Sequence, residues 1–194
     1  QKGEEEMLLQ HLGRLRSDAV GAFAVHVHLS DLRPGNRQPR FLGIAKRSFD
    51  EFISGHDSIL FTMYNADLVL MCRNVPIEDV DPVIEKVKAL FSEDPLVQGE
   101  TGSYEDRFTT WHDLSQPDDF RALSAKIKEQ EAAATIKFEK DLDEYKVQLS
   151  ATDQGTPLAP ANLAAIDQTM RSTQIAGIIR NQPVYHVIPG KKGA

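Results

Sequence analysis

Residues 58–72 read SILFTMYNADLVLMC, and this stretch decides how the surrounding chain is expected to fold. It contains two apolar runs, Ser58–Met63 and Asp67–Cys72, joined by Tyr64–Ala66. Apolar runs this close together in sequence most often pair with each other as antiparallel strands. We therefore predict a β-hairpin at the centre of the fold, with its turn at Tyr64–Ala66.

The segments around this hairpin show both strand-like and helix-like patterns. In Ala22–Leu29 every second residue is large and apolar, while His26 and His28 lie on the opposite face, which is typical of a half-exposed strand. Elsewhere the apolar spacing predicts three helices, at Glu4–Asp18, Phe41–Ile53 and Ile77–Phe91. It also predicts one further strand, at Phe108–Leu114. This order of elements predicts an α+β fold, in which an antiparallel sheet has helices packed on one face.

The chain beyond Pro117 differs in composition from the part before it. Up to Leu149 it contains no further proline and no glycine, and strong helix formers fill it, so we predict a long C-terminal helical extension. This segment either breaks into two helices near Ala132–Thr135 or forms one arm that binds a partner helix. The side chains expected on the interaction seam are Phe138, Leu142, Tyr145 and Leu149.

These patterns divide the chain into five parts. The expected parts are an N-terminal helix (1–20), a core (21–116), a helical arm (117–149), a linker (150–160), and a helical segment that leads into a following domain (161–194). Within the last part, Ala161–Arg180 has helical spacing and Gln182–Ile188 is a short strand candidate.

Composition excludes several classes of protein. The net charge is −7, which disfavours nucleic acid or an anionic membrane surface as the partner. Cys72 is the sole cysteine, so an internal disulfide or a cysteine-built zinc site is excluded, and its apolar neighbours indicate a buried thiol. No apolar run is long enough to span a bilayer and no signal peptide is visible, so we expect a cytoplasmic protein.

Motifs for catalysis are missing, and one histidine pair remains for consideration. The phosphate-binding loop, the dinucleotide fingerprint, the nucleophile elbow and the zinc-protease helix are all absent. His26 and His28 have a spacing that can chelate a metal, with His112 or Asp113 as the third ligand. Because a closed zinc site needs four ligands, we prefer to interpret the pair as an ordinary strand surface, with no metal and no cofactor.

The hairpin also carries a resemblance to a known family. The segment Tyr64-Asn65-Ala66-Asp67-Leu68 lies between two strands and is followed by a long amphipathic helix. This arrangement resembles the diguanylate cyclase (GGDEF) family, whose members carry the motif Gly-Gly-Asp/Glu-Glu-Phe at the turn of such a hairpin. The likeness covers roughly Ala22 to Leu123, and it implies the palm-type sheet of nucleotidyl cyclases.

The departures from that signature imply that catalysis has been lost. Tyr64 and Asn65 stand where two glycines would let a nucleotide approach the backbone. Asp67 keeps a single carboxylate, whereas a two-metal site needs acidic groups from more than one strand, and Asp31 is the candidate partner. The stretch 54–58 lacks the arginine of the family's inhibitory product site.

The end of the chain carries a second resemblance. Ile179–Val187 contains a Gln-Pro pair after an apolar start and resembles the opening strand of EAL-type cyclic-di-GMP phosphodiesterases. Residues 28–34 and 90–96 also resemble segments of bacterial proteins in which a degenerate GGDEF-like domain precedes an EAL-type domain. This resemblance implies that the chain is a regulatory front half, with the phosphodiesterase carboxylates beyond Ala194.

Two functions follow as expectations. The first is a non-catalytic regulatory or interaction domain of a bacterial cyclic-di-GMP signalling protein, forming homodimers through its long helices and followed by an EAL-like domain. The alternative is a sensor that binds GTP or a cyclic dinucleotide without turnover. In that case Asp31, Asp67 and Arg33 or Arg37 are the expected contacts, the arginines because a guanidinium suits phosphate.

Overall fold

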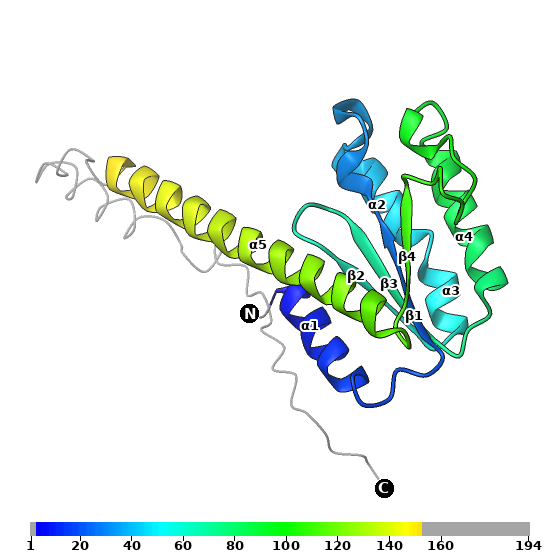
Figure 1. The fold of residues 1–194 in the computed structure, drawn as a ribbon. Coiled ribbons are helices and arrows are strands. Elements are labelled where there is room, and N and C mark those ends of the chain that lie inside the picture. The colour runs from blue at the N-terminus through cyan, green and yellow to red at the C-terminus, as the bar shows by residue number, and fades with distance from the viewer. Residues whose placement is uncertain (1–2, 153–194) are drawn as a thin grey trace, which may run out of the picture. The chain divides into compact units, whose positions relative to one another are not determined.

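The computed structural model describes residues 3–152 and shows an α+β fold built on one antiparallel sheet. The strand order is β2-β3-β1-β4, so β1 is central and pairs with both β3 and β4 (Figure 1). The strands are β1 (Ala22–Val27), β2 (Ser58–Thr62), β3 (Leu68–Arg73) and β4 (Thr109–Asp113). The hairpin predicted from residues 58–72 is confirmed, because β2 and β3 pair antiparallel.

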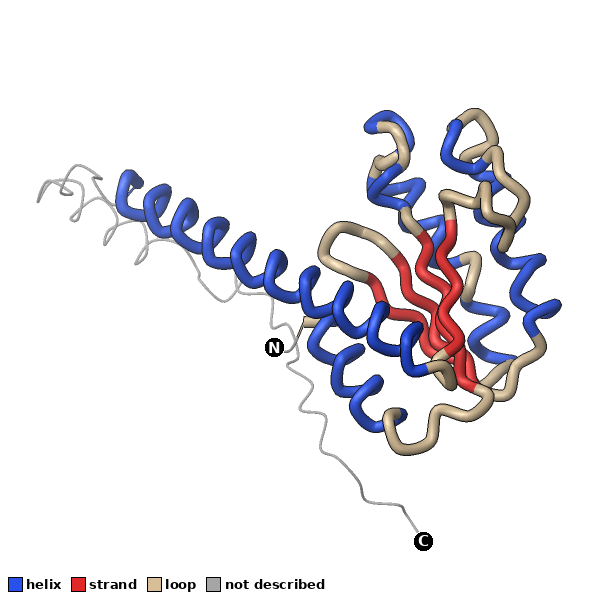
Figure 2. The backbone as a smooth tube through the Cα atoms, in the orientation of Figure 1, coloured by secondary structure: helices blue, strands red, loops and turns tan. Residues whose placement is uncertain are grey.

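The main helices of the described chain number five, and they connect or flank these strands (Figure 2). The predicted helix over 41–53 is wrong in one respect, because it is two helices that meet at Ser48 and Phe49. Ser48 ends the first helix with its hydroxyl donating to the carbonyl of Ile44, and Phe49 turns into the core, where it is fully buried. The helices are α1 (Glu4–Leu15), α2 (Pro39–Arg47), α3 (Asp50–Gly55), α4 (Ile77–Leu90) and α5 (Pro117–Thr152).

Helices cover both faces of the sheet, which corrects the expectation of helices on one face only (Figure 1). On one face Val25 and Leu70 pack with side chains of α2, α3 and α4. On the other face Ala24 and Met71 pack with leucines of α1 and with the first part of α5. The sequence pattern of β1 misled because its residues on this second face are small or polar (Ala22, Ala24 and His26), and their burial comes from the helices that cover them.

The sole cysteine lies deep in the first of these two cores. Cys72, in β3, is 3% exposed and faces the α2, α3 and α4 side of the sheet. Burial raises the pKa of this thiol to about 12, because the charged thiolate loses its hydration there. The expected buried cysteine is therefore confirmed, and it is a packing residue in the folded chain.

α5 is one continuous helix, so the alternative of a break near Ala132–Thr135 does not hold. The chain divides into two compact units, residues 1–143 and 144–194, and the sheet lies in the first. Within that unit the apolar stripe of α5 changes its role along the helix. Leu123 and Ile127 are fully buried against the sheet and α1, whereas Phe138 and Leu142 are 68% and 40% exposed. The early part of the stripe is thus core and only the later part is available to a partner.

No helix within residues 3–152 combines the length and the apolar character needed to cross a lipid bilayer. The helix predicted over Ala161–Arg180, the strand over Gln182–Ile188 and the phosphodiesterase-like segment at Ile179–Val187 lie outside the described residues.

The turn of the β2-β3 hairpin has an unusual residue at its left-handed position. Ala66 has φ of +74° and donates its N–H to the carbonyl of Met63, while Met63 donates to the carbonyl of Asp67. An L-residue with a β-carbon pays about 1 kcal/mol for this conformation, which glycine adopts without cost. Tyr64, at the start of the turn, donates its backbone N–H to the carboxylate of Glu5 in α1. The turn is therefore held from the α1 side despite the strain at Ala66.

We predict that Ala66→Gly stabilises the protein by about 1 kcal/mol, because it removes this strain. Urea unfolding followed by circular dichroism measures the change. The matched control is Ala122→Gly on the exposed surface of α5, where the same replacement should instead cost about 1 kcal/mol. A loss of stability in Ala66→Gly would show that the turn is not strained.

Candidate functional site

The candidate site lies where β1 ends beside the hairpin turn. His26 is in β1, opposite Val69 of β3 and Thr110 of β4, and its side chain is on the face that α1 and α5 cover. His28 follows just past the strand and points to the same side. Because Val27 pairs with Leu68, one further step of the same register brings Asp67 opposite His28 and diagonal to His26.

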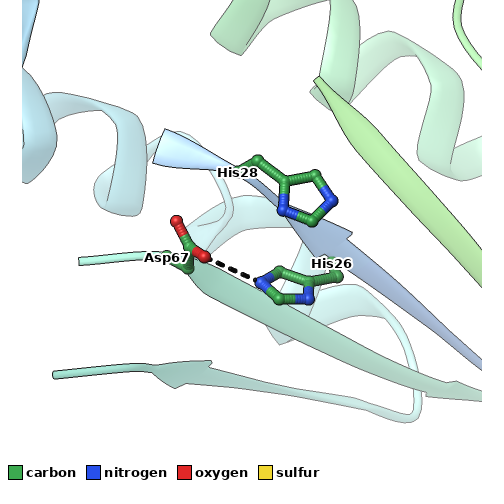
Figure 3. A group of neighbouring side chains, drawn as sticks. All are labelled: His26, His28 and Asp67. Atoms are coloured by element: carbon green, nitrogen blue, oxygen red, sulfur yellow. Dashed lines mark hydrogen bonds and ion pairs between the residues drawn. The ribbon is translucent and has the colours of Figure 1, made fainter. Parts of the chain in front are cut away.

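The three side chains of the site form a compact polar group (Figure 3). Nε2 of His26 is 2.9 Å from Oδ2 of Asp67, and the two imidazole rings of His26 and His28 have centroids 4.2 Å apart. Both members of the hydrogen-bonded pair are almost fully buried, His26 at 1% and Asp67 at 2% exposed. His28 is half-buried, so the group is open to solvent from its side.

The carboxylate of Asp67 accepts hydrogen bonds from three separate segments. Oδ2 accepts from Nε2 of His26 in β1 and from the side-chain amide of Asn65 in the turn. Oδ1 accepts from the backbone N–H of Ser30, in the short 3-10 helix η1 (Leu29–Asp31), at 2.8 Å. A buried carboxylate needs such donors because it has lost its hydration.

Asn65 closes the turn around this carboxylate. Its side-chain oxygen accepts the backbone N–H of Asp67 at 3.1 Å, while its amide nitrogen donates to Asp67 and to the hydroxyl of Ser30. Asparagine favours turns because its side chain can bond the backbone two residues later in this way. The side chain of Asn65 thus fills the space beside Asp67 and links the turn to η1.

The protonation states follow from this geometry. Burial alone would raise the pKa of Asp67, but the hydrogen bonds from His26 and from the N–H of Ser30 outweigh it and hold the pKa below its ordinary value. Burial and the neighbouring His26 lower the pKa of His28. At neutral pH the site therefore holds an ionised carboxylate beside a neutral His28.

This arrangement offers ligand atoms for a metal ion. One donor atom from each of His26, His28 and Asp67 can be chosen so that all three lie within 4.8 Å of one another. The third member is Asp67 of the hairpin, so the expectation of His112 or Asp113 in this place is wrong. His112 lies on β4 opposite Ala24, two residues along the strand from Thr110, which is opposite His26. The carboxylate of Asp113 accepts hydrogen bonds from Ser115.

The residues expected to contact a nucleotide do not gather into one site. Asp67 is buried in the site, whereas Asp31 and Arg33 are exposed in the loop that follows β1. The guanidinium of Arg37 donates to the carbonyl of Ser30, next to the site. Among residues 3–152, the group that Asp67 forms with the two histidines does not include Asp31.

The five residues matched to the cyclase signature take separate roles in the turn. Tyr64 is 40% exposed, Asn65 bonds Asp67, and Ala66 is at the left-handed position. Leu68 begins β3 and is buried in the core that α2, α3 and α4 cover.

Sequence reasoning missed a second buried carboxylate, Asp94. It is 2% exposed and accepts from the N–H of Arg33, the amide of Asn36 and the N–H of Leu96, so it fastens the loop after β1 to the segment after α4. These hydrogen bonds outweigh burial and lower the pKa of Asp94. The Asp-Pro pair at 94–95 could have indicated the capped turn that Asp94 forms with Leu96, but Arg33 and Asn36 lie about sixty residues away in sequence and leave no local signal.

No protein-family model matches the chain, and no match was found among curated proteins or solved structures.

We predict that Asp67→Asn destabilises the protein by about 2 kcal/mol at pH 7, because an amide cannot accept all the donors that now surround the carboxylate. Since the folded pKa is depressed, the stabilising effect of Asp67 is fully present above the unfolded pKa of about 3.9 and is lost as the pH falls through the folded value. Urea unfolding in EDTA-containing buffer at pH 7, 5 and 3 should show the gap between wild type and variant closing only at the acid end.

Asp31→Asn is the control for this prediction, because Asp31 is an exposed acid in the same neighbourhood. Its effect should stay within about 0.5 kcal/mol at each pH. Equal effects of the two variants would contradict the role of the buried hydrogen bonds.

Proposed function

We propose that the chain is a non-catalytic regulatory or interaction domain of a bacterial cyclic-di-GMP signalling protein, acting in the cytoplasm through a palm-type sheet. The observation that supports this most is the state of Asp67. It is the sole carboxylate among the residues matched to the cyclase signature, and it is 2% exposed and accepts three hydrogen bonds. A carboxylate that is buried and faces inward among these donors is not placed to hold the magnesium ions of a triphosphate bound outside the turn.

The turn supports the same proposal through its side chains. A nucleotide bound at this turn would need bare backbone, and Asn65 instead directs its amide onto Asp67 and Ser30. The strand order β2-β3-β1-β4 and the helices on both faces are compatible with a palm-type sheet that has been kept as a scaffold. On this proposal the domain acts on a phosphodiesterase-type domain that follows it in the same protein.

The proposed interaction surface is the exposed later part of α5, and its partner is a second copy of this chain. Phe138 and Leu142 are four residues apart on one side of the helix, and both are exposed although they are large and apolar. In the sequence, Tyr145 follows Leu142 by three residues and Leu149 follows Tyr145 by four, which is the spacing of a coiled-coil seam. Two such stripes can cover each other as a coiled coil.

We predict that Phe138→Asp weakens self-association at least about tenfold without unfolding the sheet, because it buries a charge in the seam. Sedimentation equilibrium measures the association, and circular dichroism checks the fold. Leu142→Asp should behave in the same way.

Ile136→Asp is the matched control. Ile136 is 67% exposed on the same helix, and Phe138 is 68% exposed. Because Ile136 lies two residues before Phe138, its side chain points away from the seam. Its association should equal that of the wild type. A wild type that sediments as a monomer, or a control that dissociates as readily as Phe138→Asp, would contradict the proposed seam.

The alternative of a nucleotide sensor is tested by titration. We expect no heat and no rise in melting temperature when GTP with Mg²⁺, or cyclic di-GMP, is added to the full chain. Saturable binding that is lost in Arg33→Ala would replace the scaffold proposal with the sensor.

A further inference from the structure

We propose that His26, His28 and Asp67 bind one divalent transition-metal ion, with Zn²⁺ as the best-suited member of the class. The three residues come from the end of β1 and from the hairpin turn just before β3, and each places one donor atom within 4.8 Å of the others (Figure 3). Two imidazoles and one carboxylate favour zinc, nickel or copper over magnesium, which prefers oxygen ligands. The site is therefore different in chemistry from a magnesium–nucleotide centre.

The donor atoms can be assigned from the hydrogen bonds. Nε2 of His28 is 2.7 Å from the hydroxyl of Thr110, which leaves Nδ1 of His28 for the metal. Oδ2 of Asp67 and Nε2 of His26 already face each other across the site. The Thr110 contact then orients the His28 ring, as outer hydrogen bonds commonly do for metal-bound histidines.

Only a small movement separates this arrangement from a metal site. Bonds of about 2.0–2.2 Å in tetrahedral geometry keep neighbouring donor atoms about 3.4 Å apart. The His26–Asp67 separation of 2.9 Å must open by about half an ångström, and donor atoms that are as much as 4.8 Å apart must close by about 1.4 Å or less. Asp67 keeps its bonds from Ser30 and Asn65 throughout, so the carboxylate remains fixed while the rings adjust.

The proton that now bridges His26 and Asp67 must leave the metal-facing nitrogen. A neutral His26 does this by carrying its proton on Nδ1, which frees the lone pair of Nε2; a charged His26 releases one proton to solvent. Among the charged groups around the site, Asp31 and Asp67 attract a cation, while Lys126 of α5 repels it. Three protein ligands leave one coordination position, which the exposed side of His28 opens to water or to a partner's side chain.

The test uses the full chain without a purification tag, stripped with EDTA and then titrated with Zn²⁺ in a calorimeter. We expect one ion per chain. At about a hundred times the dissociation constant, the melting temperature should rise by about 5 °C or more, because the ion binds only the folded chain. Co²⁺ in place of Zn²⁺ should show the visible absorption of a tetrahedral nitrogen–oxygen site.

His28→Gln is the decisive variant, because this half-buried side chain can be replaced without emptying the core. Its zinc affinity should fall at least about tenfold. His112→Gln is the matched control, since His112 is also half-buried, lies on the neighbouring strand and is outside the cluster; it should bind as the wild type does.

A wild type that binds no Zn²⁺ would overturn the proposal. So would binding that survives in His28→Gln and in a folded Asp67→Asn variant, because the ion would then be adventitious and held elsewhere. The seam variants of α5 should bind zinc normally, so failure of the dimer proposal and failure of this one are separate results.

Discussion

The buried hydrogen bond between His26 and Asp67 is the constraint on which this end of the sheet depends. A carboxylate without water must be surrounded by donors, and here the donors come from β1, from η1 and from the hairpin turn. This shared acceptor joins the hairpin turn to the end of β1 and to the chain that leaves it.

The inward direction of Asp67 also bears on the proposed scaffold role. An acidic side chain at a hairpin turn can hold the magnesium ions of a nucleotide bound outside the turn only if it faces solvent, and Asp67 faces inward. The site places a pair of imidazoles beside that carboxylate, and this set of donor atoms suits a transition-metal ion. The proposed scaffold and the proposed ion site are therefore compatible, since both follow from the inward direction of one side chain.

Much of the fold was predictable from local pattern, and most of the site was not. The hairpin could be predicted because its two strands are neighbours in sequence, and α4 because its apolar stripe is regular. His26 looked exposed because alternation does not reveal that α1 and α5 cover its face. Asp67 could not be chosen over His112 as its neighbour, because strand order and register decide that choice and nothing near His26 in the sequence encodes them.

The position of Cys72 gives the folded chain an internal sensor of its own opening. Its thiol lies between β3 and the helices that cover this face of the sheet, and a thiol reagent needs the thiolate, which scarcely forms there at neutral pH. Labelling can proceed only in molecules whose central strands have separated from those helices. Because the chain has a single cysteine, the rate of its modification reports how often this core opens, with no engineered probe.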